Sequence, residues 1–547
     1  MKKIKIIIFS CSIFLLLISC SEDVLDVTPR HFIGPDNLFV DASGFDSGLN
    51  GLYALFRRER GGERSGTDNN DLLIDIAISG TDNAYGNHRS GWCRVGNEYD
   101  TRNIPEEAHN RNFFTYLYQV VGSANAIISR AEDPGIDWTP TEKNRVIGEA
   151  RLFRAWAYRH LTFTYGDVPL SLVELTGSTV RSDWTRTPVA EVRAQMLEDL
   201  LFAEANLPKT SSNPGKLVQG VATHYLAELY LTLDDYPNAI TKASNLINGV
   251  NGSYSLIQSR YGVKSSIPGT PFTDMFLQGN SNKTEGNTEV LWVMQMERDV
   301  NGGGVNIMRR WFRNRSFQVR VNGSRGYFSF TDDAGGRGIG RVGPTQFALE
   351  LYEESDHRGG RFAWRTYEVL NNPSNIPNGF ALGDTIFFDY KNKMEPNNQA
   401  SWPSTRKWDN AFNNDPKEPL NAVGEGYNDQ VYLRLAETYL VLAEAQLKNS
   451  NPGGAATTIN FLRRRANASL ISAADVTVDF ILDERSRELW SEEHRRYSLA
   501  RNNKLVERYR LYARRYSSSI ADKDKLMPIP QSVIDANTTP MEQNPGY

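Results

Sequence analysis

Glycines at residues 338–343, GIGRVG, have the spacing of a nucleotide-binding loop. Such a loop binds a dinucleotide only where a buried strand precedes it and a helix begins on it. Here DDAGG precedes the glycines and Pro344 follows them, so we predict an ordinary loop. The seven histidines form no HExxH or HxH pattern, and His160 and His224 fall within helical patterns. The sequence therefore predicts neither a histidine metal site nor a cofactor.

Carboxylates could supply catalysis without a recognisable motif. Hydrolysis of a glycosidic bond needs two carboxylates placed across that bond, and 65 acidic residues neither exclude nor identify such a pair. The densest charged stretch, DERSRELWSEEHRRYSLAR, places Asp483 four residues before Arg487 and Glu492 four before Arg496. This is the spacing of ion pairs on one helix face. We predict a solvated or salt-linked helix surface there, and no catalytic residue.

The N-terminus has the order of an export signal: three lysines, an apolar run at 6–18, and the small residue Ser19. The run is too short for a membrane span, which takes about 20 residues. Cys20 after Leu-Ile-Ser resembles the lipobox of bacterial lipoproteins, and SED at 21–23 resembles the acidic export patch of Bacteroidetes-type surface lipoproteins. We predict a signal peptide at 1–19 and a lipid anchor on Cys20. The alternative is an ordinary signal peptide cut near Ser19.

Composition limits the classes of partner. With 547 residues and 40% hydrophobic content, the chain can bury one large core or two to three domains. The formal charge is -4 and becomes -7 once the signal's three lysines are removed, which does not indicate nucleic acid as a partner. Cys11 lies in the signal and Cys20 would carry lipid. Cys93 is then alone, and we expect a small buried side chain without a disulfide.

Helical periodicity dominates the chain. Apolar residues recur every three or four positions at 114–128 and 147–165. Residues 217–248 form two such stretches around the turn DDYP, with Ala227 and Ala243 at the crossing, and are similar to a tetratricopeptide unit. A second pair lies at 433–467, beyond a long insertion. We predict a mainly α fold, a superhelix of tetratricopeptide-like helix pairs with a loop-rich insertion containing short β-strands.

The insertion divides the mature chain into three regions. Gly, Asn, Ser and Pro are dense at 251–428, where 290–294 and 317–321 are strand-like. We therefore predict an N-terminal helical region at 20–250, a variable region at 251–428 and a C-terminal helical region with an extended tail at 429–547. Binding residues are expected in the long loops that a rigid helical scaffold carries.

The final stretch, LMPIPQSVIDANTTPMEQNPGY, closely resembles the C-terminal signature of the SusD/RagB family of surface glycan-binding lipoproteins. Further stretches that resemble this family follow in the expected order: LDVTP at 25–29, RLFRAWAYRHLTFTYGDVPL at 151–170, RTPVAEVRAQMLEDLLFAEANLP at 186–208, YLRLAETYLVLAEAQ at 432–446, and ILDERSRELWSEEHRRYSLAR at 481–501. The resemblance covers nearly the whole mature chain and rests on scaffold residues, which do not name a ligand.

The resemblance implies a four-unit tetratricopeptide-like scaffold with variable loops. It further implies a surface-exposed outer-membrane lipoprotein seated on a SusC-like TonB-dependent transporter, which captures oligosaccharides without cleaving them. Some relatives bind peptides instead. We therefore expect a non-enzymatic binding protein with a glycan ligand, and keep a peptide-binding import component and a secreted glycan hydrolase as alternatives.

Two loop-like stretches combine aromatic rings, which stack on sugar rings, with polar side chains that bond to hydroxyls. The first is SGTDNAYGNHRSGWCRVGNEYD, at 79–100. Its candidate ligand contacts are Asn83, Tyr85, Arg89, Trp92 and Tyr99. Alternatively, Trp92 fills a gap between this loop and the scaffold, because large aromatic side chains are usually mostly buried.

The second stretch, at 306–330, is a basic island in an acidic protein: no Asp or Glu lies between Val300 and Thr331. Its candidate ligand contacts are Arg310, Trp311, Phe312 and Tyr327, beside further arginines at 309, 313, 315, 320 and 325. Guanidinium groups bind carboxylates and sulfates through charge-assisted bonds, so the ligand could be an anionic saccharide. Alternatively, the island contacts acidic scaffold helices or the transporter.

Overall fold

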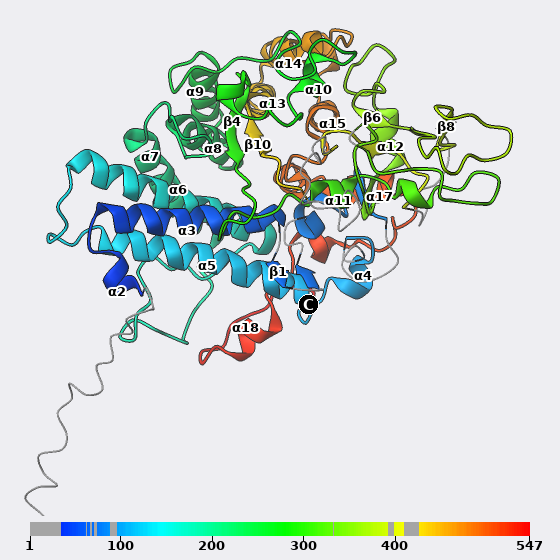
Figure 1. Ribbon diagram of the computed structural model, residues 1–547. Helices are drawn as coiled ribbons and strands as arrows, with labels where there is room; N and C mark the ends of the chain where they lie inside the picture. The colour runs from blue at the N-terminus through cyan, green and yellow to red at the C-terminus, as the bar shows by residue number, and fades with distance from the viewer. Residues whose placement is uncertain are drawn as a thin grey trace, which may run out of the picture.

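The computed structural model describes residues 34–61, 63–65, 68–70, 74–87, 94, 96–331, 333–391, 399–409 and 426–547 (Figure 1). The predicted signal peptide and Cys20 lie outside these residues, as does Cys93. Within the described part of the chain, no helix has both the length and the apolar character needed to cross a membrane.

Helices form most of the structure. The longer ones are α3 (Ala42–Gly61), α5 (Ala108–Arg130), α6 (Pro140–Tyr165), α7 (Val189–Asn206), α8 (Gln219–Thr232), α9 (Tyr236–Ile247), α13 (Leu435–Lys448), α14 (Pro452–Arg465), α15 (Val478–Leu489), α16 (Arg495–Arg501) and α17 (Leu505–Tyr512). The short ones are α2 (Pro35–Leu38), α4 (Tyr99–Arg102), α10 (Pro271–Asp274), α11 (Met308–Phe312), α12 (Gln346–Glu350) and α18 (Gln531–Asp535).

Strands are short and pair in twos. They are β1 (Glu63–Ser65) with β2 (Asp68–Asn70), β3 (Ala84–Gly86) with β5 (Val342–Pro344), β4 (Val290–Met294) with β10 (Gln430–Arg434), β6 (Trp364–Arg365) with β9 (Ser404–Thr405), and β7 (Tyr367–Val369) with β8 (Thr385–Phe387), all antiparallel. The predicted mainly α class with short strands in the insertion is therefore confirmed.

The helices stack in chain order, and the insertion does not interrupt the stack. Helix α5 packs on α3, each of α6 to α9 packs on its predecessor, and α13 packs on α9 although nearly 190 residues separate them (Figure 1). Ala227 and Ala243 are fully buried where these helices meet, together with Val441 and Ala445 of α13. Small side chains at these positions let the helix axes approach closely. The predicted superhelix of helix pairs is thus confirmed.

The two helix pairs share one turn design. Before α9 and before α14, one residue adopts a positive φ of 58°, Asp234 in the first turn and Ser450 in the second. The following residue, Asp235 or Asn451, caps the new helix by accepting a bond from a backbone N–H, and a proline lies in its first turn. These local signals start each second helix.

The insertion is tied to the scaffold where its strand β4 pairs with β10, which leads directly into α13. All five residues of each strand are buried, and the phenyl ring of Phe56 on α3 stacks on Trp292 at 3.9 Å. The predicted strand at 290–294 is confirmed. The predicted strand at 317–321 is wrong: Ser316–Gln318 forms a 3-10 turn, because Val321 pairs with Ser324 in its own turn and Val319 and Val321 pack into a local cluster.

The terminal motif lies on the ends of α5 and α6. The backbone N–H of Met527 donates to Thr164 O at 2.7 Å, and Asn110 Nδ2 donates to Pro528 O at 2.6 Å. Asn544 of the final QNPGY donates through Nδ2 to Tyr165 O and Met527 O at 3.0 and 2.7 Å. The predicted extended tail therefore closes the scaffold by satisfying backbone carbonyls at a helix end.

A buried ion network joins α15 to the insertion, to β10 and to α14. The Glu488 carboxylate accepts from Arg434 at 2.5 Å, from Arg358 at 3.0 Å and from Arg465. All four side chains are at most 2% exposed. Burial alone would raise the pKa of Glu488, but the three guanidinium groups outweigh burial and hold that pKa below its ordinary value.

The charges at 483–501 are salt-linked, as one of the two predicted alternatives has it, whereas the solvated alternative and the predicted pairings within the helix are wrong. Asp483 pairs with Arg508 at 2.5 Å rather than with Arg487, and Glu492 pairs with Arg434 at 2.7 Å rather than with Arg496. The buried acidic and basic members of this stretch are Glu484, Arg485, Glu488, Glu492, Glu493, Arg495 and Arg496. Sequence spacing alone could not show that arginines from distant segments surround this helix.

Replacing Glu488 by glutamine removes one charge without changing the side-chain volume. We expect Glu488→Gln to lower the free energy of unfolding by about 3 to 5 kcal/mol, because three buried guanidinium groups lose their shared counter-ion. Urea unfolding at pH 7 measures this change. The control is Glu507→Gln, whose side chain is 60% exposed and pairs with Lys504; it should change stability by about 0.5 kcal/mol or less.

Equal effects of the two changes would contradict a structural role for the network. Because the pKa of Glu488 is depressed in the fold, its contribution to the free energy of unfolding is present above the pKa of the unfolded chain and is lost as pH falls. The difference in free energy of unfolding between Glu488→Gln and the unchanged chain should therefore shrink below about pH 4.

Candidate functional site

The structure brings the first predicted loop beside the segment 338–344, which in turn lies against the second predicted loop, where the backbone N–H of Ile339 donates to Arg310 O at 3.0 Å. Strand β3 follows Asn83, and β5 ends the glycine-containing segment 338–343. In their ladder Tyr85 lies opposite Gly343, and the backbone N–H of Asn87 donates to Arg341 O at 2.6 Å. Segments 250 residues apart in the chain thus meet on one side of the helical scaffold. The glycine segment is a loop before β5, as predicted, and no helix begins on it.

The candidate contacts from the first loop are buried wherever the structure describes them. Asn83, Tyr85 and Tyr99 are 1 to 2% exposed. Asn83 Nδ2 donates to Ser486 Oγ at 2.9 Å, and the Tyr99 hydroxyl donates to Gly80 O at 2.7 Å. The prediction that these side chains are exposed is wrong, because they join the loop to α15 and α16. Arg89 and Trp92 lie outside the described residues.

The candidate aromatic contacts from the second loop are buried as well. Trp311 and Phe312 are 0 and 1% exposed, and the Phe312 ring meets the Trp490 ring edge-on at 5.5 Å. Tyr327 is 7% exposed and belongs to a cluster formed by the insertion itself. The prediction of exposed rings is wrong here too. The short helix α11 directs Trp311 and Phe312 into the core, and Tyr327 packs within the insertion. Arg310 is half-buried.

Other residues of the same region lie nearer the surface. Phe317 and Phe330 are half-buried, and their rings meet edge-on at 5.5 Å. The Arg337 guanidinium lies over both rings, at 5.3 and 5.9 Å from their centres. Arg315 and Arg341 complete the group, which we call the arginine–aromatic face: Arg315, Phe317, Phe330, Arg337 and Arg341. The acid-poor composition of 301–330 pointed to this region but not to which of its rings are accessible.

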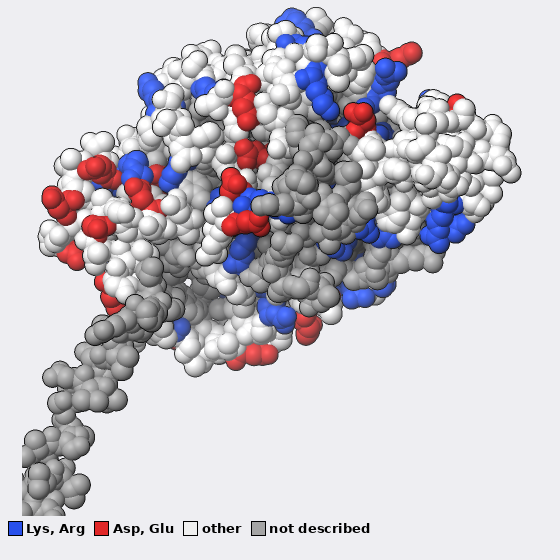
Figure 2. All heavy atoms as spheres, viewed as in Figure 1, with Lys and Arg blue, Asp and Glu red and all other residues white. Residues whose placement is uncertain are grey.

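Positive charge is concentrated at the arginine–aromatic face. Partial burial lowers the pKa of Arg315, and the nearby guanidinium groups of Arg341 and Arg337 lower it further. Like charges this close repel one another, so an anion bound between them would be stabilised. Figure 2 shows basic side chains gathered along the lower edge of the right-hand part of the molecule. Aromatic rings and cations side by side can bind a ring-shaped ligand that carries acidic groups.

Two further arginines of the island bond within the insertion. Arg313 is fully buried and forms a two-bond pair with Glu368 of β7, at 2.7 and 3.0 Å. Arg320 is exposed and donates to Gly323 O at 2.7 Å. The acidic partner of Arg313 therefore belongs to the insertion itself, and not to a scaffold helix as the alternative had it.

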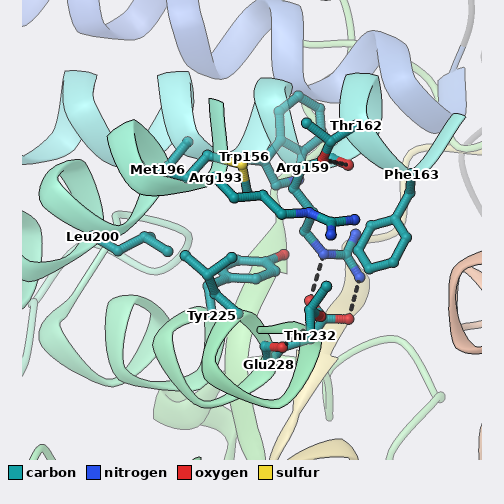
Figure 3. A pocket seen from close by; sticks show the side chains of 12 residues that line it. Trp156, Arg159, Thr162, Phe163, Arg193, Met196, Leu200, Tyr225, Glu228 and Thr232 are labelled. Carbon is teal, nitrogen blue, oxygen red and sulfur yellow. Dashed lines mark hydrogen bonds and ion pairs between the residues drawn. The ribbon is translucent and has the colours of Figure 1, made fainter. Parts of the chain in front are cut away.

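The scaffold interior holds a small cavity between α6, α7 and α8 (Figure 3). Arg159 lies beside Trp156 and Phe163, and its guanidinium donates to both oxygens of Glu228 at 2.5 and 2.7 Å. The cavity has a volume of about 10 Å³, room for at most one water molecule. It is a packing gap around a buried ion pair and cannot hold an organic ligand.

Glu59, His160 and His494 form a group close enough to share a metal ion among the described residues. Arg159 Nη1 lies 3.1 Å from His494 Nδ1, and a guanidinium can only donate. His494 Nδ1 must then accept, which places the ring's hydrogen on Nε2, 2.9 Å from Glu59 Oε1. A nitrogen that carries hydrogen cannot ligate a metal. In this arrangement the group is a hydrogen-bonded network.

Glu59 makes this network sensitive to pH. Burial raises the pKa of Glu59 to about 7, despite opposing contributions from Arg60 and the Tyr432 hydroxyl. A group whose pKa is raised by folding stabilises the fold at low pH and loses that contribution as pH rises towards its folded pKa. His160 and His494 act in the opposite direction, because burial and the charge of Arg159 lower the pKa of each.

We expect Glu59→Gln to remove the contribution of this one carboxyl while keeping both histidines. Between pH 4.5 and pH 8, the stability of the unchanged chain should fall relative to the variant by roughly 2 to 3 kcal/mol. Urea unfolding of both proteins across this range measures the difference. A difference that stays constant with pH would show that Glu59 is ionised in the fold. Glu507→Gln, at an exposed site, should follow the unchanged chain.

Comparison with known proteins agrees with this architecture. Residues 386–547 match the SusD family model, and residues 64–231 match a family described as starch-binding associating with outer membrane. SusD-like protein P2 of Formosa agariphila is 25% identical to this chain, and the alignment covers 100% of both chains. SusD-like protein P25 of the same organism is 22% identical, and the alignment covers 99% of this chain and 98% of P25.

Solved structures show the same fold. A SusD homolog from Bacteroides thetaiotaomicron aligns with a TM-score of 0.71 at 19% identity, covering 94% of this chain and 98% of its own. A laminarin-binding SusD-like protein aligns with a TM-score of 0.67 at 20% identity, covering 92% of this chain and 99% of its own. The resemblance stated from the C-terminal signature is confirmed, and the chain belongs to the SusD/RagB family.

Proposed function

We propose that this protein captures glycans at the cell surface without cleaving them and delivers them to a SusC-like TonB-dependent transporter. The observation that carries the proposal is the arginine–aromatic face, where two long loops of a SusD-type scaffold meet. A structural neighbour with this fold is a laminarin-binding SusD-like protein, and one matching family is described as starch-binding associating with outer membrane. A lipid on Cys20 would hold the protein at the outer membrane.

Binding would use two kinds of contact at this face. The half-buried rings of Phe317 and Phe330 offer apolar surface to the C–H faces of sugar rings. Arg315, Arg337 and Arg341 would donate charge-assisted bonds to carboxylate or sulfate groups. We therefore propose that anionic saccharides bind more tightly than neutral ones. The energy for uptake would come from the transporter, since a binding protein only needs to hold and release its ligand.

The first test separates binding from hydrolysis. The soluble form beginning at Ser21 is run on native gels that contain neutral, anionic or no polysaccharide, and reducing ends are assayed in parallel. We expect retardation in an anionic glycan gel without new reducing ends. New reducing ends would identify a hydrolase. Absence of retardation in every glycan would contradict the proposal and favour the peptide-binding alternative.

A second test addresses the arginine–aromatic face directly. We expect Arg315→Gln and Arg337→Gln each to weaken binding of the retarding anionic glycan about tenfold or more, because each removes a charge-assisted hydrogen bond. Binding should also weaken with rising salt, less steeply in the variants. Isothermal titration at two salt concentrations measures both effects. Arg514→Gln, an exposed arginine of the C-terminal region, is the matched control and should bind as the unchanged chain does.

A further inference from the structure

The hairpin of β7 and β8 carries apolar side chains on the face that points away from the protein. Side chains alternate between the two faces of a strand, and the inner face holds Glu368, which is buried and accepts two bonds from Arg313. Phe387 on the outer face is 74% exposed and Val369 is 37% exposed. This reverses the usual order of an antiparallel pair, in which the apolar side chains face inwards. The outer face consists of two cross-strand pairs, which we call the hairpin face: Tyr367, Phe387, Val369 and Thr385.

The hairpin face offers the two kinds of contact that a sugar residue needs. The rings of Tyr367 and Phe387 lie 6.0 Å apart and are inclined by 54°, so the pair is open rather than stacked. Within the described part of the chain, neither the Tyr367 hydroxyl nor the exposed Thr385 hydroxyl has a hydrogen-bond partner. Ring surface beside available hydroxyls suits the C–H face and the hydroxyls of a sugar.

The hairpin face favours an uncharged ligand. Between Thr366 and Phe388 the charged residues are Glu368, which is buried, and Asp384, whose Oδ2 accepts from the backbone N–H of Ala381 at 2.8 Å. Figure 2, drawn from the same side as Figure 1, shows few charged side chains on the right-hand lobe that carries β8, apart from basic ones at its lower edge. A carboxylate or sulfate would lose water on this face without gaining a cationic partner.

The hairpin face is too small to hold a protein partner by itself. Each strand contributes three residues, so the face measures about 10 Å in each direction, an area of about 100 Å². A stable protein interface buries about 800 Å² on each partner. A sugar residue needs only the area of one or two aromatic rings, so the face matches one residue of a glycan.

The hairpin face is joined directly to the arginine–aromatic face. Asn371, two residues beyond β7, accepts a bond from the backbone N–H of Ser329 at 2.6 Å and donates one to Ser329 O at 3.0 Å. Phe330 of the arginine–aromatic face follows Ser329 in the chain. Three peptide steps and the Asn371 side chain therefore connect Val369 with Phe330, which keeps the two within about 20 Å of each other. One extended glycan chain can span this distance and contact both faces.

We infer that the hairpin face is a second glycan subsite, which binds an uncharged residue of the same glycan chain whose acidic residues bind at the arginine–aromatic face. The inference rests on the proposed function and narrows its ligand class to oligosaccharides of several residues that contain both acidic and uncharged sugars. Once one face has bound the chain, the other face meets it at a high effective concentration. Affinity should therefore rise with chain length until the chain reaches both faces.

Oligosaccharides of defined length test the inference. The probes are size-separated fragments, from disaccharides upwards, of a polysaccharide that contains acidic and uncharged sugars and retards the protein on native gels. We expect Phe387→Ala to weaken binding of the long fragments about fivefold or more, because a stacking surface is lost, and to leave binding of the short fragments unchanged. Isothermal titration measures both. Equal weakening at every length, or no weakening at any length, would overturn the inference.

Two further variants separate stacking from other effects. Phe387→Tyr keeps an aromatic ring and should bind the long fragments as the unchanged chain does; a loss as large as that of Phe387→Ala would contradict stacking. Phe461→Ala, at an aromatic position of α14 that is 45% exposed, is the matched control and should not change binding at any length. A loss in this control equal to that of Phe387→Ala would also overturn the inference.

The outcomes distinguish this inference from the proposed function. If the unchanged chain binds no glycan, both fail. If Arg315→Gln and Arg337→Gln weaken binding while Phe387→Ala changes it at no length, or if only polysaccharides built entirely from acidic sugars retard the protein, the proposed function stands and the second subsite fails. If sedimentation shows that Phe387→Ala converts a dimer to a monomer, the hairpin face is a contact between copies of this chain, and the inference fails as well.

Discussion

Buried ion pairs around α15 and α16 hold together parts of the chain that the helical stack alone would leave separate. Glu488 and Glu492 contact arginines and a lysine from β10, α14 and the insertion, while Asp82 contacts Arg495 and Arg508. Burying so many charges is costly unless every partner is present, so the network is satisfied in one arrangement of the segments. This arrangement fixes the insertion relative to the scaffold.

The position of the arginine–aromatic face depends on that arrangement. Ser486 and Trp490 of the charged region bond to Asn83, which leads into β3, and β3 pairs with β5. The face thus lies on loops whose roots are fixed in the core, while Phe317, Phe330 and Arg337 remain near the surface.

Much of the fold follows from the sequence because local signals and apolar periodicity agree along the helices. The pairs at 217–248 and 433–467, the turn residues before α9 and α14, and the strand at 290–294 could all be predicted in this way. The burial of Glu484 and Glu488 could not, because their partners come from segments far away in the chain. The sequence also predicts surface positions for the rings of Tyr85, Trp311 and Phe312. That prediction fails because polar neighbours in the sequence do not show which side of a short element faces the core.

The site was predicted at the level of segments rather than side chains. The acid-free stretch 301–330 contains part of the arginine–aromatic face, yet Phe317 and Phe330 are its accessible rings. Hydrogen–deuterium exchange with and without a saturating anionic glycan tests the location most directly. If the arginine–aromatic face binds the glycan, we expect slower hydrogen exchange in 313–341 and 84–87, with no change in 171–184. Protection confined to 171–184, or to scaffold helices remote from the insertion, would contradict it.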